Sequence, residues 1–184
     1  QRGVVATGAM SDPYNPLERK LRLTRHALEL LSAYGFGVAV DTKSDLVSRD
    51  ADVLSEIAAQ MPALVKFSIT TADPALAARL EPGAPSPERR FAAMEQLAKA
   101  GVFTGLLLMP VLPGLTDNRE NLSRLLRQTA EAGGRFCYCW PGLTMREGQR
   151  EYFYQALNRE FPGLREKYEK RYGPRYRCTV PGAA

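Results

Sequence analysis

The feature that most constrains the fold of this chain is a repeat of short apolar segments separated by helical patterns. Five such segments start about 28 to 38 residues apart, the spacing of βα units. They are GVVATGAM, FGVAVDT, ALVKFSIT, VFTGLLLM and RFCYCW. Their alternating positions are apolar on both sides, as in parallel strands that are covered on both faces. Such a repeat forms either a doubly wound sheet or a barrel.

The alternation of side chains within two of these segments separates a large apolar face from a small or polar one. In LVKFSIT the large apolar side chains share one face, and Lys66 and Ser68 lie on the other. FGVAVDTK divides in the same way, with Asp41 and Lys43 on its polar side. A sheet covered by helices on both faces has little use for charged groups, whereas a barrel with a wet interior accommodates them. We therefore predict a barrel in which Asp41 and Lys66 pair across adjacent strands, because unpaired charges inside it would be costly.

Local signals predict where several helices begin. Thr24 precedes RHALELLSAY, and Ser86 with Pro87 opens ERRFAAMEQLAKA. Asp117 and Glu120 have the spacing of a capping box ahead of a further helix. Each predicted helix is followed by glycine, which is typical of a helix end.

Composition excludes several classes of protein. A chain of 184 residues with 45% hydrophobic residues can bury one sizeable core. No apolar run approaches the roughly 18 residues that a membrane span needs, and the N-terminus has no signal-peptide pattern. We therefore expect a cytoplasmic protein without membrane contact. The three cysteines have neither a disulfide framework nor metal-ligand spacing, so we expect free thiols.

The positive charge of the chain is concentrated near its C-terminus. From Leu143 onward there are nine basic and five acidic residues, which accounts for most of the net charge of +5. The segment REKYEKRYGPRYR interleaves Tyr168, Tyr172 and Tyr176 with basic side chains. Such a segment can follow a phosphate backbone and stack on bases. The alternative is a solvated terminal helix whose tyrosines pack on the rest of the protein.

Polar or turn-forming loops follow the strand segments at their C-terminal ends. They include SDPYNPLE, TKSDLVSRD, TTADPALAARLEP, PVLPGLTD and WPGLTMREG. Barrels of this kind place their chemistry at that rim, because loops from separate strands converge there. Lys43 lies on this rim, so we expect it to meet an anion that the hydroxyl of Ser68 shares.

The order and spacing of six motifs resemble one enzyme family. The motifs are SDPYNPLE, LTRHALELL, TKSDLVSRD, FSITTAD, LEPGAPSPERRFAAMEQLAKAGV and PVLPGLTD. Together they are similar to radical S-adenosylmethionine (SAM) proteins related to spore photoproduct lyase, often called DNA repair photolyases. The resemblance covers residues 3 to 160. It implies a partial TIM-type (β/α)6 barrel, of which this chain carries about five βα units, with SAM and a [4Fe-4S] cluster at the strand ends.

The resemblance also implies roles for individual residues. Lys43 and Ser68 correspond to the pair that binds the SAM carboxylate, and Ser11 and Asp12 lie on the loop that meets its amino group. Met109, together with the backbone after residue 139, corresponds to the place where adenine is cradled. The alternative for Met109 is an ordinary core position in an apolar strand.

The chain departs from the family pattern in two ways. The C-x-x-x-C-x-x-C motif that holds the cluster is absent, so we expect that the chain begins after the first βα unit and cannot cleave SAM as it stands. Such a start would leave a strand edge unpaired and prone to association. The second departure is Ala9, which stands where spore photoproduct lyases carry a cysteine hydrogen donor. Cys139 is a candidate replacement donor, although a cysteine in a strand is more often a small core residue.

These observations lead to one prediction of function and two alternatives. We predict a radical SAM enzyme domain, residues 1 to 160, followed by a basic, tyrosine-containing extension, residues 161 to 184. The resemblance implies a 5'-deoxyadenosyl radical that takes a hydrogen atom from an unknown substrate, nucleic acid being one candidate, and an electron donor such as flavodoxin or ferredoxin. The first alternative is a non-catalytic nucleic-acid-binding module on a barrel scaffold. The second is a radical enzyme that acts on a peptide or small molecule.

Overall fold

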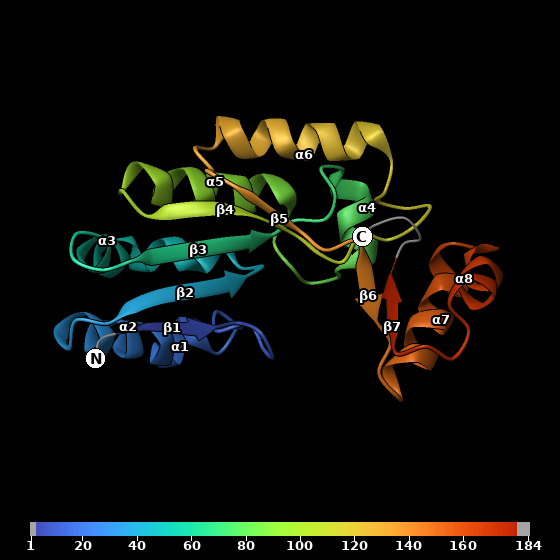
Figure 1. The fold of residues 1–184 in the computed structure, drawn as a ribbon, viewed down its shortest axis with the longest axis horizontal. Coiled ribbons are helices and arrows are strands. Elements are labelled where there is room, and N and C mark those ends of the chain that lie inside the picture. The colour runs from blue at the N-terminus through green and yellow to red at the C-terminus, as the bar shows by residue number, and fades with distance from the viewer. Residues whose placement is uncertain (1–2, 180–184) are drawn as a thin grey trace.

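The parallel sheet predicted from the five apolar segments is present. The computed structural model describes residues 3–179, so residues 1–2 of the predicted barrel domain and residues 180–184 of the predicted extension lie outside it. Five parallel strands form one sheet in chain order (Figure 1). They are β1 (Val4–Thr7), β2 (Gly37–Thr42), β3 (Ala63–Ser68), β4 (Phe103–Leu108) and β5 (Cys137–Cys139). This sheet confirms the predicted α/β fold of the partial TIM type.

Helices cover one face of the sheet, and Figure 1 shows α3 and α5 behind it. The helices of this part are α1 (Glu18–Leu21), α2 (Leu23–Ala33), α3 (Ala51–Ala58), α4 (Pro74–Leu80), α5 (Pro87–Lys99) and α6 (Arg119–Glu131), with a 3-10 helix η1 (Asp45–Asp50) before α3. Val40, Phe67 and Leu106 are fully buried in the core between the sheet and these helices. The large apolar face of the strands therefore packs against the helices, as their alternation predicts.

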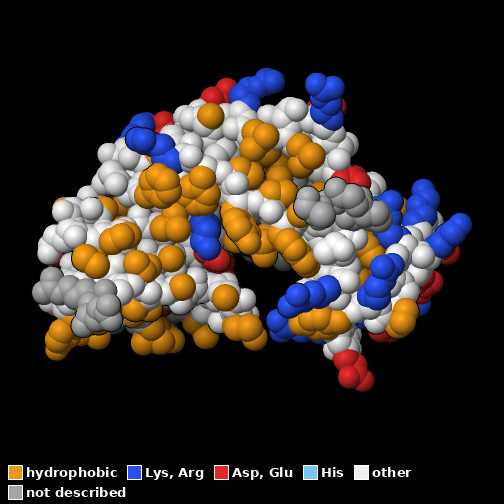
Figure 2. All heavy atoms as spheres, in the orientation of Figure 1, with side chains coloured by type: hydrophobic (Ala, Val, Ile, Leu, Met, Phe, Trp, Pro, Cys, Tyr) orange, Lys and Arg blue, Asp and Glu red, His pale blue; other side chains and the backbone are white. Residues whose placement is uncertain are grey.

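The other face of the sheet is open and carries the predicted charge pair. Asp41 and Lys66 are register partners, and their Oδ1 and Nζ atoms are 2.7 Å apart, which confirms the predicted pairing. Phe103 of β4 and Tyr138 of β5 are half exposed. Figure 2 shows hydrophobic side chains across this half of the molecule. β1 lies at one edge of the sheet, where Val4 is half exposed.

The helix starts are partly as predicted. Ser86 caps α5 through a hydrogen bond from the amide of Arg89 to its hydroxyl oxygen, and Pro87 is the first helical residue, as expected. The predicted capping box of Asp117 and Glu120 is wrong, because Asn118 is the cap of α6. Asp117 instead accepts a hydrogen bond from the amide of residue 114.

The predicted start of α2 at Thr24 is also wrong, because the helix begins at Leu23 and Thr24 lies inside it. The carboxylate of Glu18 accepts hydrogen bonds from the amides of Thr24 and Arg25, so a residue of the preceding helix satisfies the free N–H groups. The hydroxyl of Thr24 donates to the carbonyl oxygen of Pro13 instead. None of the helices within residues 3–179 has both the length and the apolar character that crossing a bilayer requires.

A C-terminal unit, residues 142–179, packs beside the carboxyl ends of the strands (Figure 1). It consists of the antiparallel strands β6 (Gly142–Thr144) and β7 (Arg177–Thr179) and the helices α7 (Gln149–Glu160) and α8 (Leu164–Tyr172). Its apolar cluster contains Leu143 and Tyr168 and also Leu112 from the loop after β4. The hydroxyl of Tyr168 donates to the carbonyl oxygen of Pro113 at 2.9 Å, which ties the unit to that loop. The division of the chain at residue 160 stays a prediction.

Candidate functional site

Lys43 lies at the end of β2 and is held there through its backbone by Asp12. One carboxylate oxygen of Asp12 accepts a hydrogen bond from the amide of Lys43 at 2.7 Å. The other accepts from the hydroxyl of Thr42 at 2.7 Å and from the amide of Tyr14 at 2.9 Å. Both oxygens are therefore engaged within the protein. Asp12, which is predicted to lie near a ligand amino group, positions the Lys43 loop, and its neighbour Ser11 is exposed.

A glycine allows the loop after β1 to approach β2 closely. Gly8 has a φ of 101°, a left-handed conformation that favours glycine. A Cβ atom at this position would lie 2.0 Å from the carbonyl oxygen of Asp41. The close contact brings the following residues, including Asp12, within reach of the end of β2.

A buried network of charged residues stabilises the loop after β1. Asp50 is fully buried and accepts hydrogen bonds from the hydroxyl of Tyr14 at 3.1 Å and from Arg25 at 3.2 Å. Arg49 donates to both carboxylate oxygens of Asp50 at 2.8 Å and also to Glu18 at 2.9 Å. Burial and the adjacent Asp50 raise the pKa of Tyr14, so its hydroxyl remains a donor. The network links the start of α2 to the loop that carries Asp12.

Lys43 and Ser68 lie at the same rim and are connected through two residues that were not predicted. The Nζ atom of Lys43 is 3.8 Å from Oε1 of Glu81, and its side chain is 43% exposed. Arg90 is almost completely buried; its guanidinium pairs with Oε2 of Glu81 at 2.7 Å and donates to the carbonyl oxygen of Ser68 at 2.6 Å. The side chain of Ser68 is buried at the end of β3.

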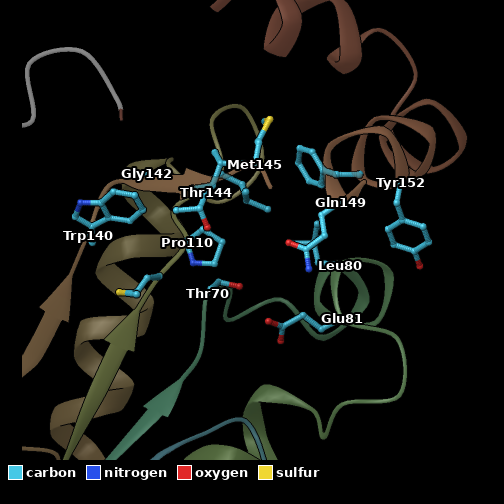
Figure 3. Close-up of a pocket in the computed structure, with 14 residues that line it drawn as sticks. Thr70, Leu80, Glu81, Pro110, Trp140, Gly142, Thr144, Met145, Gln149 and Tyr152 are labelled. Carbon is cyan, nitrogen blue, oxygen red and sulfur yellow. The ribbon is translucent and has the colours of Figure 1, made fainter. Parts of the chain in front are cut away.

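A cavity of about 450 Å³, which we call the main cavity for its position rather than its size, lies between the strand ends and the C-terminal unit (Figure 3). Apolar and aromatic side chains form most of its wall, among them Met109, Pro110 and Trp140. The polar groups in the wall include Glu81 from the end of α4 and Gln149 from α7, and Figure 3 shows both directed toward the hollow. This composition is typical of a site for a flat organic ligand with a few polar groups.

A second cavity, about 500 Å³, adjoins the loop after β1. Lys43, Asp12 and Arg19 are among its lining residues. Because Lys43 lines this cavity and Glu81 lines the main one, their ion pair lies between the two.

Of the other predicted site residues, Met109 lines the cavity and Cys139 lies on the surface. Met109 lines the main cavity, and its role beside an adenine stays a prediction. Cys139 is exposed on β5, directly before Trp140, and partial desolvation of its thiol raises its pKa above the ordinary value. All three cysteines are free, as expected.

Sequence reasoning missed Glu81, Trp140 and Gln149. Two of these had a signal, since Glu81 lies in the motif LEPGAPSP that carries the resemblance and Trp140 directly follows residue 139, where the resemblance places an adenine.

The residues that the structure describes do not fit a [4Fe-4S] cluster. They contain no group of three or more His, Cys, Asp or Glu side chains that could hold a metal ion. Cys137 and Cys139 are both on β5 and Cys178 is buried in the C-terminal unit, so the thiols do not converge on one place. No step of the chemistry is therefore assigned to a cluster within residues 3–179.

The fold defines an α/β protein of the partial-barrel type, with a cavity at the carboxyl ends of its strands. Residues 2–126, more than half of the chain, match the radical SAM superfamily. The chain belongs to that superfamily.

Two relatives of this chain differ in their sequence identity and in the share of the chain that they match. Rv2578c of Mycobacterium tuberculosis is 35% identical over 172 residues, which is 94% of this chain and 50% of the relative. MJ0683 of Methanocaldococcus jannaschii is 30% identical over 116 residues, or 63% of this chain and 43% of the relative. The chain thus spans about half the length of the curated relatives it matches.

Solved structures of spore photoproduct lyase have a similar fold. The lyase complexed with dinucleoside spore photoproduct superposes with a TM-score of 0.56 at 17% identity, covering 87% of this chain and 59% of the lyase. A mutant of the lyase with bound AdoMet and dinucleoside spore photoproduct gives a TM-score of 0.52 at the same identity and coverage. At this identity the similarity shows the fold alone.

Proposed function

We propose that this chain is the SAM-binding part of a radical SAM enzyme related to spore photoproduct lyase. The observation that carries the proposal is the main cavity at the strand ends, where Met109 and Trp140 form an apolar wall and the Lys43–Glu81 pair forms a charged edge. Because the described residues hold no cluster ligands, we expect the chain alone to bind SAM without cleaving it.

The residues present fit SAM in size and in chemistry. A cavity of about 450 Å³ is within the range of small-molecule sites, which is about 300 to 1,000 Å³. Trp140 and Met109 supply surfaces against which a purine can pack. Among the residues that the structure describes, Lys43 has only a long contact to Glu81, so its ammonium group is available to a ligand carboxylate.

The protein's own contribution is to position the ligand and to exclude water from one side of it. In this superfamily bound SAM supplies a carbon-centred radical that removes a hydrogen atom from the substrate. Asp12 holds the backbone of Lys43, and Arg90 holds Glu81, so the charged edge of the cavity is preorganised. The C-terminal unit closes the opposite side through Gln149 and Phe153 of α7.

Fluorescence titration provides a direct test, because the chain has a single tryptophan, Trp140, and it lines the cavity. Addition of SAM should change the emission of Trp140 with saturation. Lys43→Met should weaken SAM about tenfold, since it removes one charge-assisted contact. Lys99→Met, which lies outside the cavity on α5, is the matched control and should leave the affinity unchanged. Lack of saturable binding, confirmed by equilibrium dialysis, would refute the proposal.

A second proposal concerns the substrate: a single-stranded nucleic acid that contacts the C-terminal unit. Figure 2 shows Lys and Arg side chains gathered over this unit. Within residues 3–179, seven of its cations have no carboxylate at ion-pair distance, namely Arg146, Arg150, Lys167, Lys170, Arg171, Arg175 and Arg177, and of these Arg150 donates to backbone carbonyl oxygens. Tyr168 and Tyr172 are buried and do not offer their rings for stacking, whereas Tyr176 is half exposed. The side chains of this unit are therefore better suited to bind phosphate groups than to stack on bases.

Salt dependence tests this second proposal. Binding of a fluorescent oligothymidine should weaken steeply as the salt concentration rises, because each phosphate contact releases a counterion. Replacing both Lys167 and Lys170 by Gln should reduce the slope by about two contacts. Binding that does not depend on salt, or a double variant with an unchanged slope, would contradict it.

A further inference from the structure

A cavity of about 640 Å³, which we call the α8 cavity, lies where α8 packs against the loop between β4 and α6 (Figure 1). It shares no lining residue with the main cavity. The loop separates the two, because its earlier residues Met109 and Leu112 line the main cavity. The polar groups that line the α8 cavity come from Asp117 of the loop and from three cations of the helix, Lys167, Lys170 and Arg171.

The wall of the α8 cavity is held together by contacts that leave its cations free. The hydroxyl of Tyr168 donates to the carbonyl oxygen of Pro113 at 2.9 Å and so joins the helix to the loop. Gly114 has a φ of 74°, and a Cβ atom there would lie 3.4 Å from Cδ2 of Leu164. One carboxylate oxygen of Asp117 accepts a hydrogen bond from the amide of Gly114 at 2.8 Å. The helix and the loop are therefore positioned without a ligand.

The three cations of the α8 cavity have no acidic partner within the protein. Among residues 3–179, none of Lys167, Lys170 and Arg171 has a carboxylate at ion-pair distance. They are three or four positions apart, so they lie on neighbouring parts of one helix face. Stabilisation of a helix C-terminus by cations accounts for Lys170 and Arg171 in the last turn, but not for Lys167 in an earlier turn. An anionic ligand accounts for all three.

We propose that the α8 cavity binds a nucleoside diphosphate. Its three cations outnumber its single carboxylate, and Arg and Lys are the side chains that bind adjacent phosphate groups. The second oxygen of Asp117 accepts no hydrogen bond within residues 3–179, so it is available to the hydroxyl groups of a ribose. Pro113 and Leu164 supply apolar surface for the base, and the volume is sufficient for a nucleotide.

This inference goes beyond the proposed function, because it concerns a cavity that the SAM site does not use. It shares Lys167 and Lys170 with the proposed nucleic-acid surface, so the test uses small ligands that differ in one part at a time. Uridine diphosphate (UDP) carries the two phosphates, the ribose hydroxyls and a base. Its 2',3'-dideoxy analogue lacks the hydroxyls, and pyrophosphate lacks the whole nucleoside. A pyrimidine avoids the purine proposed for the main cavity.

Isothermal titration calorimetry of the wild-type protein should show that UDP binds about tenfold more tightly than either of the other two ligands. Arg171→Gln should weaken UDP and pyrophosphate alike by about tenfold, because it removes a charge-assisted contact to phosphate. Asp117→Asn should weaken UDP to the level of its dideoxy analogue without weakening pyrophosphate. The one acceptor oxygen of an asparagine is needed for the amide of Gly114.

Two controls separate the site from net charge and from folding. Arg177→Gln removes the same charge from β7, in the same unit but outside the α8 cavity, and should weaken UDP less than twofold. Retained pyrophosphate binding by Asp117→Asn shows that the cavity is intact in that variant. Circular dichroism of Arg171→Gln should match that of the wild-type protein.

Several outcomes would overturn the inference. Equal losses in Arg171→Gln and Arg177→Gln would mean that only the net charge matters. Wild-type protein that binds pyrophosphate as tightly as UDP would exclude a site for the nucleoside. Salt-dependent binding of oligothymidine without any binding of UDP overturns this inference alone, whereas binding of UDP without oligothymidine overturns the nucleic-acid proposal alone. The SAM titration of Trp140 is decided separately from both.

Discussion

The two sides of the main cavity are held in place by different kinds of interaction. On the sheet side, buried Asp50 accepts directional hydrogen bonds from Tyr14 and from two arginines, and these support the loop of the charged edge. On the C-terminal side, the ring of Tyr168 packs edge-on against Phe153 and Tyr172, with both centroid distances 5.6 Å. Hydrogen bonds fix both the distance and the direction of a charged group. Packing of aromatic rings mainly determines the shape of the cavity wall. In the proposed function, the sheet side therefore supplies charged groups to the ligand and the C-terminal side supplies a shaped surface.

The largest expected effect comes from removing the centre of the charged side. Asp50→Asn should lower the free energy of unfolding by about 3 to 5 kcal/mol, because it leaves Arg25 and Arg49 without their buried partner. Urea denaturation followed by circular dichroism measures the change. Asp52→Asn removes an exposed partner of the same Arg25 and should cost less than about 1 kcal/mol. Similar losses in both variants would show that the network is not anchored at Asp50.

The next effect tests whether the charged side positions Lys43. Asp12→Ala removes the acceptor of three hydrogen bonds and should lower the free energy of unfolding by about 2 to 3 kcal/mol. It should also weaken S-adenosylhomocysteine more than 5'-methylthioadenosine, since only the former has a carboxylate for Lys43. Ser11→Ala, an exposed neighbour, should change stability by less than about 0.5 kcal/mol. Equal weakening of both ligands by Asp12→Ala would argue against a positioning role.

A smaller effect separates the contribution of a hydrogen bond from that of ring packing within the C-terminal unit. Tyr168→Phe removes the hydrogen bond to Pro113 and should cost about 1 kcal/mol. Tyr172→Phe should cost close to nothing or stabilise the protein, because its buried hydroxyl has no hydrogen-bond partner within residues 3–179. Thermal unfolding of the two variants, compared with wild type, measures both changes in stability. A larger loss for Tyr172→Phe would reveal a polar contact of its hydroxyl and weaken the contrast between the two sides.

The features predicted correctly from the sequence are those set by local period and local capping. The five strands follow from the repeated apolar segments, and the Asp41–Lys66 pair follows from the alternation of side chains along β2 and β3. Ser86 caps its helix through a hydrogen bond from the amide of a residue close in sequence. The helix starts predicted at Thr24 and Asp117 are wrong because other side chains accept the hydrogen bonds from the amides of the first helical turn. At Thr24 the acceptor is Glu18 of the preceding helix, and at Asp117 it is the adjacent Asn118.

The site was only partly predictable for a related reason. Lys43 and Met109 follow directly from strands, so their place at the rim could be predicted from parity and resemblance. Glu81 reaches the site because Arg90 binds it from another helix, and Gln149 does so because the C-terminal unit folds back onto the loop after β4. The first contact joins neighbouring helices and the second joins segments far apart in the chain, so neither follows from the pattern of a single strand or helix.

The smallest expected effect concerns the outer rim of the charged network and its response to acid. The hydrogen bond from Arg25 lowers the pKa of Asp52 from 3.8 to about 2. Folding therefore favours the ionised carboxylate, so Asp52 stabilises the protein above pH 4, and this contribution is lost as the pH falls from about 4 to about 2. Because Asp52 is largely exposed and screened, the contribution is less than about 1 kcal/mol. Urea denaturation at pH 6 and at pH 3 should show a slightly shallower loss of stability for Asp52→Asn than for wild type, and an equally steep loss would place the acid sensitivity deeper in the network.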